Sequence, residues 1–113
     1  MAKFERTIRT DIHALAAWTE HIILENSISA SLEDTSDFVS GSAVCCVRVF
    51  ERYSYLGQNR VSLSVTFFDG GDGNVHISAI ASGGSQAMMF KINTFGEENF
   101  LEEYRSALNR YQP

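Results

Sequence analysis

The chain has 113 residues, of which 44% are hydrophobic and 20% charged, and its nine basic and fourteen acidic residues give a formal net charge of −5. This length is typical of one domain, and the composition is that of a chain that folds rather than one that stays disordered. The acidic balance argues against nucleic acid, whose phosphates attract basic proteins, and against a role at a membrane surface. We therefore expect a single domain over residues 1–113, with neither nucleic acid nor a membrane as its partner.

Two features of the sequence bear on its location. No apolar run approaches the roughly 20 residues that cross a bilayer, and residues 1–6 lack the apolar centre of a signal peptide. Cys45 and Cys46 are neighbours, so in a strand their side chains point to opposite faces and are badly placed to bridge each other. These features predict a cytoplasmic protein without structural disulfides.

The first quarter of the chain contains a strand followed by a helix. Alternation over residues 3–9 predicts an opening strand, whose charged members suggest an edge position. Thr10 and Asp11 are both competent N-caps, and from Ile12 onward apolar residues recur at the spacing of an amphipathic helix. This helix is expected over residues ~11–26.

The middle of the chain returns to the period of two that is typical of strands. Residues 27–33 predict a second strand, which stops at the turn-rich residues 34–37. From about residue 38 to residue 55 the sequence predicts a long β-rich stretch, bent or bulged near Gly41.

Three further strands are expected. Residues 61–67 alternate valine, leucine and phenylalanine with serine and threonine, and residues 75–81 continue the apolar alternation after a turn rich in glycine and aspartate. Gly83 and Gly84 turn the chain again, and residues 86–92 predict a last strand.

The C-terminal segment predicts a second helix. Thr94 and Glu97 have the spacing of a capping box, and apolar residues follow at helical intervals, so the helix is expected over residues ~95–111. The element order predicts an α+β fold, with a mainly antiparallel sheet of about five to six strands and both helices packed on one face.

The sheet face opposite the helices is the main candidate for function. If regular apolar positions lie under the helices, a mixture of polar and apolar side chains is left for the outer face. Candidate binding residues there are Arg48, Arg52, His76 and Lys91, and candidate interface residues are Phe50, Phe68, Ile80 and Met89. Three interpretations stay open: an ordinary solvated face, a surface for self-association or a partner, and a site for an anionic ligand.

No motif with recognisable chemistry is present. His13 and His21 are eight residues apart, too far along a helix for the i,i+4 pair of a zinc site. Residues 69–74 superficially suggest a calcium loop, but they lack the terminal glutamate of an EF-hand, and no serine, histidine and carboxylate can be assigned to a triad. We expect no metal, no cofactor and no catalytic residues, which disfavours an enzyme.

Three segments carry a resemblance to a known family. They are residues 27–34 (SISASLED), 47–55 (VRVFERYSY) and 82–97 (SGGSQAMMFKINTFGE). Together with the overall length, they resemble a family of small bacterial proteins classed as a domain of unknown function, and the likeness spans nearly the whole chain. The resemblance implies a bacterial cytosolic protein, and it supplies no activity and no catalytic residues.

The sequence thus favours a non-enzymatic interaction or small-ligand-binding module, acting through the outer sheet face or a crevice between the helices and the sheet. One alternative is a homo-oligomeric structural protein that associates through its sheet face. Another is an enzyme that acts on a small anionic substrate through Arg48, Arg52 and His76.

Overall fold

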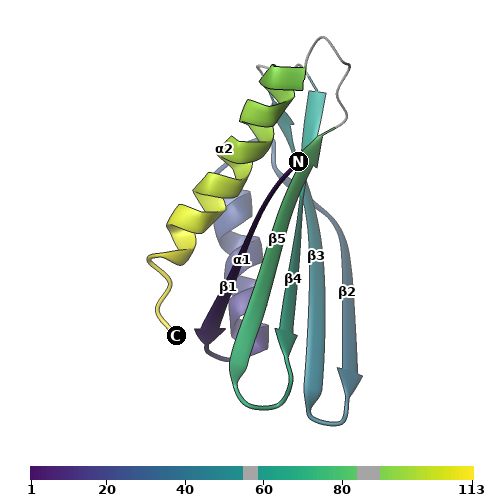
Figure 1. Ribbon diagram of the computed structural model, residues 1–113, viewed down its shortest axis with the longest axis vertical. Helices are drawn as coiled ribbons and strands as arrows, with labels where there is room; N and C mark the ends of the chain where they lie inside the picture. The colour runs from purple at the N-terminus through teal and green to yellow at the C-terminus, as the bar shows by residue number, and fades with distance from the viewer. Residues whose placement is uncertain (55–58, 84–89) are drawn as a thin grey trace.

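The structure is a computed structural model that describes the backbone of residues 1–54, 59–83 and 90–113, and the side chains of residues 1–53, 60–83 and 96–113. The described residues form five strands and two helices, which are labelled in Figure 1. In chain order they are β1 (Ala2–Arg9), α1 (Ile12–Glu25), β2 (Ser31–Ser40), β3 (Ala43–Ser54), β4 (Asn59–Asp69), β5 (Asn74–Gly83) and α2 (Phe90–Leu108). The α+β fold expected from the sequence is confirmed.

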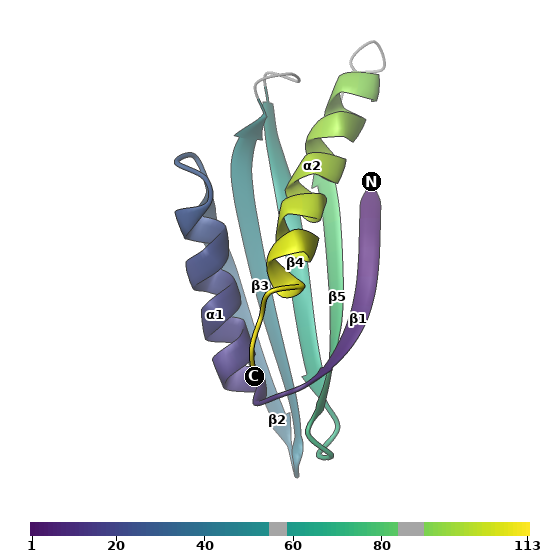
Figure 2. The ribbon, with the colours of Figure 1, turned by 90° about the vertical axis from the view of Figure 1, so that its left-hand side faces the viewer.

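All five strands form one antiparallel sheet in the order β1-β5-β4-β3-β2. Successive antiparallel strands β2 to β5 lie next to each other, as short connections favour. β1 pairs with β5, the last strand, so α1 carries the chain from one edge of the sheet to the other (Figure 2). β1 and β2 are therefore the two edges, and β4 is the central strand.

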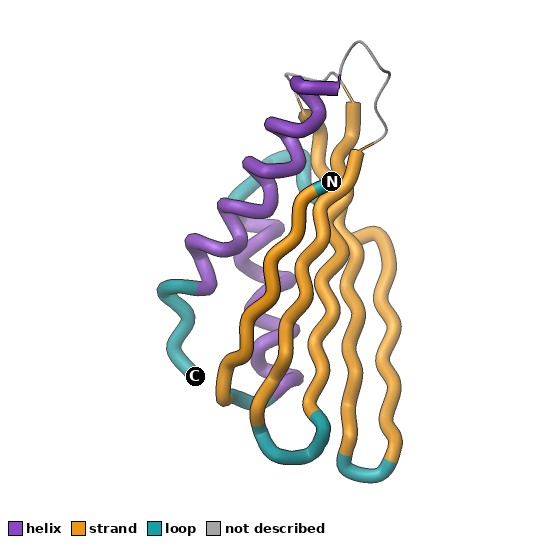
Figure 3. Tube along the Cα trace, in the orientation of Figure 1, coloured by secondary structure: helices purple, strands orange, loops and turns teal. Residues whose placement is uncertain are grey.

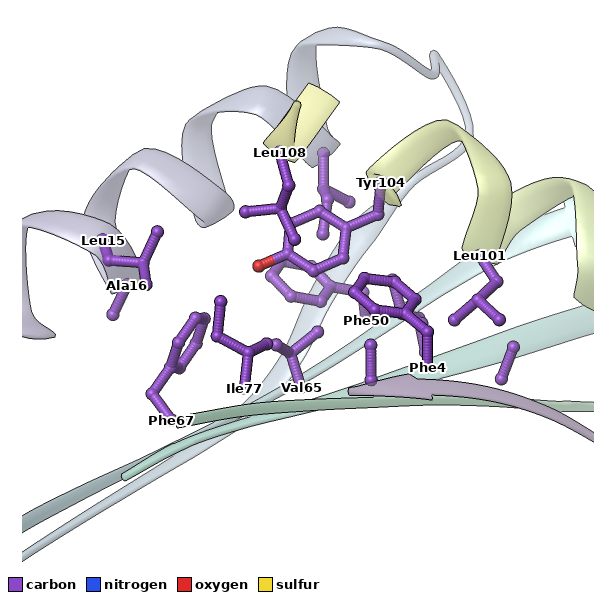
Figure 4. Close-up of a cluster of buried hydrophobic side chains, with 14 of the residues drawn as sticks. Phe4, Leu15, Ala16, Phe50, Val65, Phe67, Ile77, Leu101, Tyr104 and Leu108 are labelled. Atoms are coloured by element: carbon purple, nitrogen blue, oxygen red, sulfur yellow. The ribbon is translucent and has the colours of Figure 1, made fainter. Parts of the chain in front are cut away.

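Both helices pack on the same face of the sheet, and the core lies between these two layers (Figure 4). Along β4 every second side chain is fully buried against the helices, and these residues are Val61, Leu63, Val65 and Phe67. Their serine and threonine neighbours point the other way, which is the alternation that a one-sided core requires. α1 begins after the N-cap Asp11, whose carboxylate accepts a hydrogen bond from the amide of Ala14 at 2.9 Å.

A buried hydrogen bond joins the two helices above the sheet. The hydroxyls of Thr19 on α1 and Tyr104 on α2 lie 2.8 Å apart, and both side chains are buried. Burial raises the pKa of the Tyr104 phenol well above its ordinary value, so this group stays neutral. Trp18 of α1 also packs edge-on against Tyr111, which lies near the end of the chain, with 4.9 Å between ring centroids.

The predicted second strand and the turn after it were placed too early in the sequence. Ile28 lies fully exposed outside any strand, whereas residues 34–37 continue β2 rather than forming a turn. The turn falls at residues 41–42, where Gly41 has a φ of 59°, and Ser40 pairs directly with Ala43. Polar residues are tolerated along β2 because it is an exposed edge strand that pairs only with β3.

The predicted last strand over residues 86–92 is wrong for residues 90–92, which are helical, and residues 86–89 lie outside the described part. A short apolar run does not distinguish a strand from a helix by periodicity alone. Glu97, expected in a capping box, instead lies inside α2, where its buried carboxylate accepts a hydrogen bond from the Gly83 amide at 3.0 Å. This bond ties α2 to the end of β5.

We predict that Tyr104→Phe lowers the free energy of unfolding by about 1–2 kcal/mol, because it leaves the buried Thr19 hydroxyl without its partner. The double variant Tyr104→Phe, Thr19→Val should lose less than the sum of the two single changes. Urea unfolding followed by circular dichroism measures all three. Tyr111→Phe is the control because its hydroxyl bond to Thr10 is only part-buried, and a Tyr104→Phe protein as stable as the parent would contradict the account.

Candidate functional site

The face of the sheet opposite the helices is uncovered. Figures 1 and 2 show both helices on one side of the sheet, and Figure 3 shows the five strands side by side. Within the part of the chain that the structure describes, no helix or strand lies over the other side. Because side chains alternate along a strand, every second residue projects from this side, which we call the open face.

Strand pairing arranges the open face in three rows that each cross all five strands. Residues directly opposite each other in a ladder share a face, so the register assigns each row without ambiguity. From β1 to β2, the rows are Lys3, Ile80, Ser64, Val49 and Asp34; Glu5, Ser78, Thr66, Val47 and Ser36; and Thr7, His76, Phe68, Cys45 and Phe38. We name them the Lys3, Glu5 and Thr7 rows.

Large apolar side chains reach solvent in this face. Phe38 is 63% exposed, Phe68 44% and Ile80 36%, and Val47 and Val49 lie half-buried between them. Serines and threonines occupy the positions between the apolar groups, so the centre of the face carries no charge. Single exposed apolar groups are ordinary, but several on one flat surface are typical of an interaction site.

A hollow of about 350 Å³ lies in the open face toward the β1 edge. It is lined by Glu5, Arg6, Thr7, Thr66, Phe68, His76, Ile77 and Ser78. His76 is held on two sides, since Thr7 Oγ1 lies 3.0 Å from His76 Nδ1 and the Phe68 ring stacks at 6.4 Å between centroids. The lining of the hollow therefore combines aromatic rings, hydroxyl groups and the charged residues of β1.

Arg48 does not lie on this face, and its predicted placement is wrong. It is only 8% exposed and points toward α1, where Nε lies 3.2 Å from a carboxylate oxygen of Glu20 and Nη1 lies 2.7 Å from one of Asp37. Nη1 also donates to the carbonyl oxygen of Val47 at 2.9 Å. Arg48 thus joins α1 to β2 and β3 beneath the helix layer.

Arg52 and Phe50 share the covered face with Arg48, because residues two apart on a strand point the same way. The Arg52 guanidinium lies 4.4 Å from the centroid of the Phe100 ring and forms an ion pair with Glu103 of α2. Phe50 is fully buried in the core. Both were expected on the outer face, so the predicted phase of β3 is inverted.

The other predicted site residues divide into two groups. His76, Phe68 and Ile80 lie on the open face. Lys91 belongs to α2 rather than to a strand, and its side chain lies outside the described residues, as does Met89. The cations proposed for an anion site therefore do not converge, since Arg48 and Arg52 face the helices while His76 faces the opposite way.

Several residues of the open face were not predicted from the sequence, among them Phe38, Cys45, Val47 and Val49. β3 carries apolar residues at both odd and even positions, so alternation alone did not reveal which set is covered. One available signal was the Gly41-Ser42 dipeptide, because a two-residue hairpin with glycine first sets the register of the strands on both sides. No pattern in the sequence indicated the carboxylate partners of Arg48.

The sequence model of a family described as "Family of unknown function (DUF6054)" matches residues 1–112 of the chain. The chain belongs to this family. The resemblance to a domain of unknown function over nearly the whole chain is thereby confirmed, and the family's description names no activity. No curated protein and no solved structure matches the chain.

The described residues contain no group of three or more histidine, cysteine, aspartate or glutamate side chains placed to hold a metal ion. No helix among them is long and apolar enough to cross a membrane.

The Arg48 cluster, formed by Arg48, Glu20 and Asp37, sets a dependence of stability on pH. Hydrogen bonds from Arg48 hold the pKa of Asp37 below its ordinary value of 3.8. A lowered pKa in the folded state stabilises the fold above pH 4, and this contribution is lost as the pH falls through the folded-state pKa.

We predict that Asp37→Asn lowers the free energy of unfolding at pH 7 by about 0.5–1 kcal/mol, a modest loss because the Asp37 side chain is 51% exposed to screening solvent. Below pH 4 the parent protein should lose stability more steeply than this variant. Urea unfolding at a series of pH values tests both points. Glu98→Gln, on the exposed side of α2, is the matched control, and parallel pH profiles for the parent and Asp37→Asn would contradict the prediction.

Proposed function

We propose that the protein is a non-enzymatic interaction module whose open face docks a partner surface. The observation that carries this proposal is the exposure of Phe38, Phe68 and Ile80 on one face of the sheet, around a centre free of charge. Depletion of charge at the centre, with aromatic residues present, distinguishes an interface from the rest of a protein surface.

The polar residues of the open face fit the same role. Within the three rows, charged groups stand only at the two edges, with Lys3 and Glu5 on β1 and Asp34 on β2, while Glu51 and Arg60, beyond the Lys3 row, pair with each other. Hydroxyl groups lie between the apolar side chains, and beyond the Lys3 row Ser62 and Ser82 bond to each other at 2.8 Å. An apolar centre with a charged rim excludes water from the contact while the rim sets orientation and specificity.

The space between the helices and the sheet supports this choice over a ligand crevice. Phe100 and Tyr104 fill it, and the cavity left beside Ile22 and Arg52 measures about 10 Å³. A cavity of that size holds about one water molecule, whereas ligand pockets measure roughly 300–1,000 Å³. The enzyme alternative loses its support as well, because Arg48 and Arg52 are already paired with carboxylates under the helices.

We place this module in the cytoplasm of a bacterium. Cys45 and Cys46 are both free, on opposite faces of β3, and burial raises the pKa of the Cys46 thiol to about 11. The two cysteines are badly placed to bridge each other, so the fold does without a disulfide of its own, as is typical of proteins from a reducing compartment. Osmotic-shock fractionation of cells that make the protein tests this location, and release with the periplasmic fraction would overturn it.

The docking proposal predicts which surface of the protein can be cross-linked to its partner. A photoreactive benzoylphenylalanine in place of Ser64, at the centre of the open face, should form a covalent adduct on irradiation in the cells that make the protein. The same group in place of Ala17, exposed on α1, should form none.

Phe68→Glu should abolish the Ser64 adduct by placing a charge in the centre of the contact. Denaturing electrophoresis and mass spectrometry of the adduct report the result. The absence of an adduct at Ser64, or equal adducts at Ser64 and Ala17, would overturn the proposed function.

A further inference from the structure

We infer that the occupant of the open face is a second copy of this chain, packed face to face about a twofold axis that runs along β4. This inference rests on the proposed function and names its partner. It follows from three properties of the open face: the symmetry of the strand order, the placement of its charges, and the match between an exposed aromatic side chain and a hollow.

The strand order makes such an axis possible. In the sequence β1-β5-β4-β3-β2, β4 is central. A twofold axis parallel to β4 lays β1 of one copy over β2 of the other, and β5 over β3, while each row keeps its level along the strands. Each row then faces the same row of the second copy, with the order of the strands reversed. A twofold contact requires this kind of self-complementarity.

The Lys3 row pairs opposite charges under this operation. Lys3 meets Asp34 of the second copy, Ile80 meets Val49 of the second copy, and Ser64 meets its own equivalent. Neither Lys3 nor Asp34 forms an ion pair within the described side chains, so both charges are available. Symmetry gives each dimer two such pairs, one at each edge of the contact.

In the Glu5 row, a charged side chain faces a neutral hydrogen-bond donor rather than an opposite charge. Glu5 meets Ser36 of the second copy, whose hydroxyl can donate to the carboxylate. Val47 meets Ser78 of the second copy, and Thr66 meets its own equivalent. No like charges are brought together in any of the three rows.

The Thr7 row matches a protrusion to a depression. Phe38 on β2 is 63% exposed, and the hollow of about 350 Å³ lies at the opposite edge of the same face. The twofold axis carries Phe38 over Thr7 of the second copy, at the rim of that hollow. Burying such a ring removes the largest exposed apolar group of the face from water.

Another axis in the plane of the face fits less well. An axis perpendicular to the strands would lay β2 over β2 and reverse the order of the rows. Asp34 would then face Phe38 of the second copy, and Lys3 would face Thr7 of the second copy. That arrangement buries an unpaired carboxylate against an aromatic ring, which is costly. The charges therefore select the axis along β4.

The size of the contact sets its strength. Five strands spaced about 4.8 Å apart, each with about eight residues rising about 3.3 Å, give a face of about 630 Å² per copy, or about 1,260 Å² in total. This lies at the lower end of specific interfaces, which bury about 1,200–2,000 Å². A reversible dimer is therefore expected, with its two sheets aligned to within about 30°.

Exchanging the charges at Lys3 and Asp34, which face each other across the two copies, tests the arrangement. Sedimentation equilibrium from micromolar to millimolar concentration should show a monomer–dimer equilibrium for the parent protein. Lys3→Glu and Asp34→Lys should each raise the dissociation constant about tenfold or more, because each creates two like-charge contacts. The double variant should return to within about threefold of the parent value.

This restoration can only come from contact between copies. Within one chain, Lys3 and Asp34 are separated by four strand spacings, about 19 Å, which is more than two Debye lengths at physiological salt. Lys3→Glu combined with Glu25→Lys, on exposed α1, is the matched control because it makes the same change in charge. That control should stay as weak as Lys3→Glu alone.

Phe38→Ser provides an independent readout, since the exposed ring can be removed without disturbing the core, and it too should weaken the dimer. A dimer that the double charge exchange fails to restore would overturn the axis along β4. A protein that stays monomeric at millimolar concentration, yet forms an adduct at Ser64 with a different protein, would overturn the second copy and leave the proposed function standing. A monomer without any adduct would overturn both.

Discussion

The pairing of β3 with β4 decides which side chains of this protein meet the helices and which meet solvent. Arg48 lies opposite Val65, and Phe50 opposite Leu63, so the covered face of β4 places these β3 residues under α1 and α2. A slip of one residue would expose Phe50 and bury Val49 and Glu51. Because both helices lie on the same side, this one register determines the content of the core and of the open face together.

The parts of the fold that the sequence predicted are those with a strong period and a local end signal. β4 and β5 alternate cleanly, and α1 begins at the cap Asp11, so these elements were expected close to where they lie. β2 was misplaced because an exposed edge strand has no apolar face to reveal it. The start of α2 was missed because residues 90–92 end a short apolar run whose alternation reads as a strand, and periodicity alone does not distinguish the two in so short a run.

The residues of the candidate site could be predicted only in a strand whose own sequence shows which of its sides faces the helices. The hydroxyl-bearing side of β4 was anticipated, since its other side is uniformly apolar. β3 has apolar groups on both sides, so its alternation does not reveal which side is covered. The covered side carries Arg48, whose charge is paired by Glu20 of α1 and Asp37 of β2, and no pattern within β3 encodes those two contacts.

The two edges of the sheet differ from its open face in what they offer to a neighbouring molecule. β2 carries a bulge between Leu32 and Asp34, and charged side chains follow it. Along β1, charged side chains project from the open face. An added strand would meet an interrupted ladder at one edge and fixed charges at the other. Lateral growth into an open-ended array is thereby disfavoured. A sheet of this kind can expose one broad face without nucleating the edge-to-edge strand addition that forms fibres.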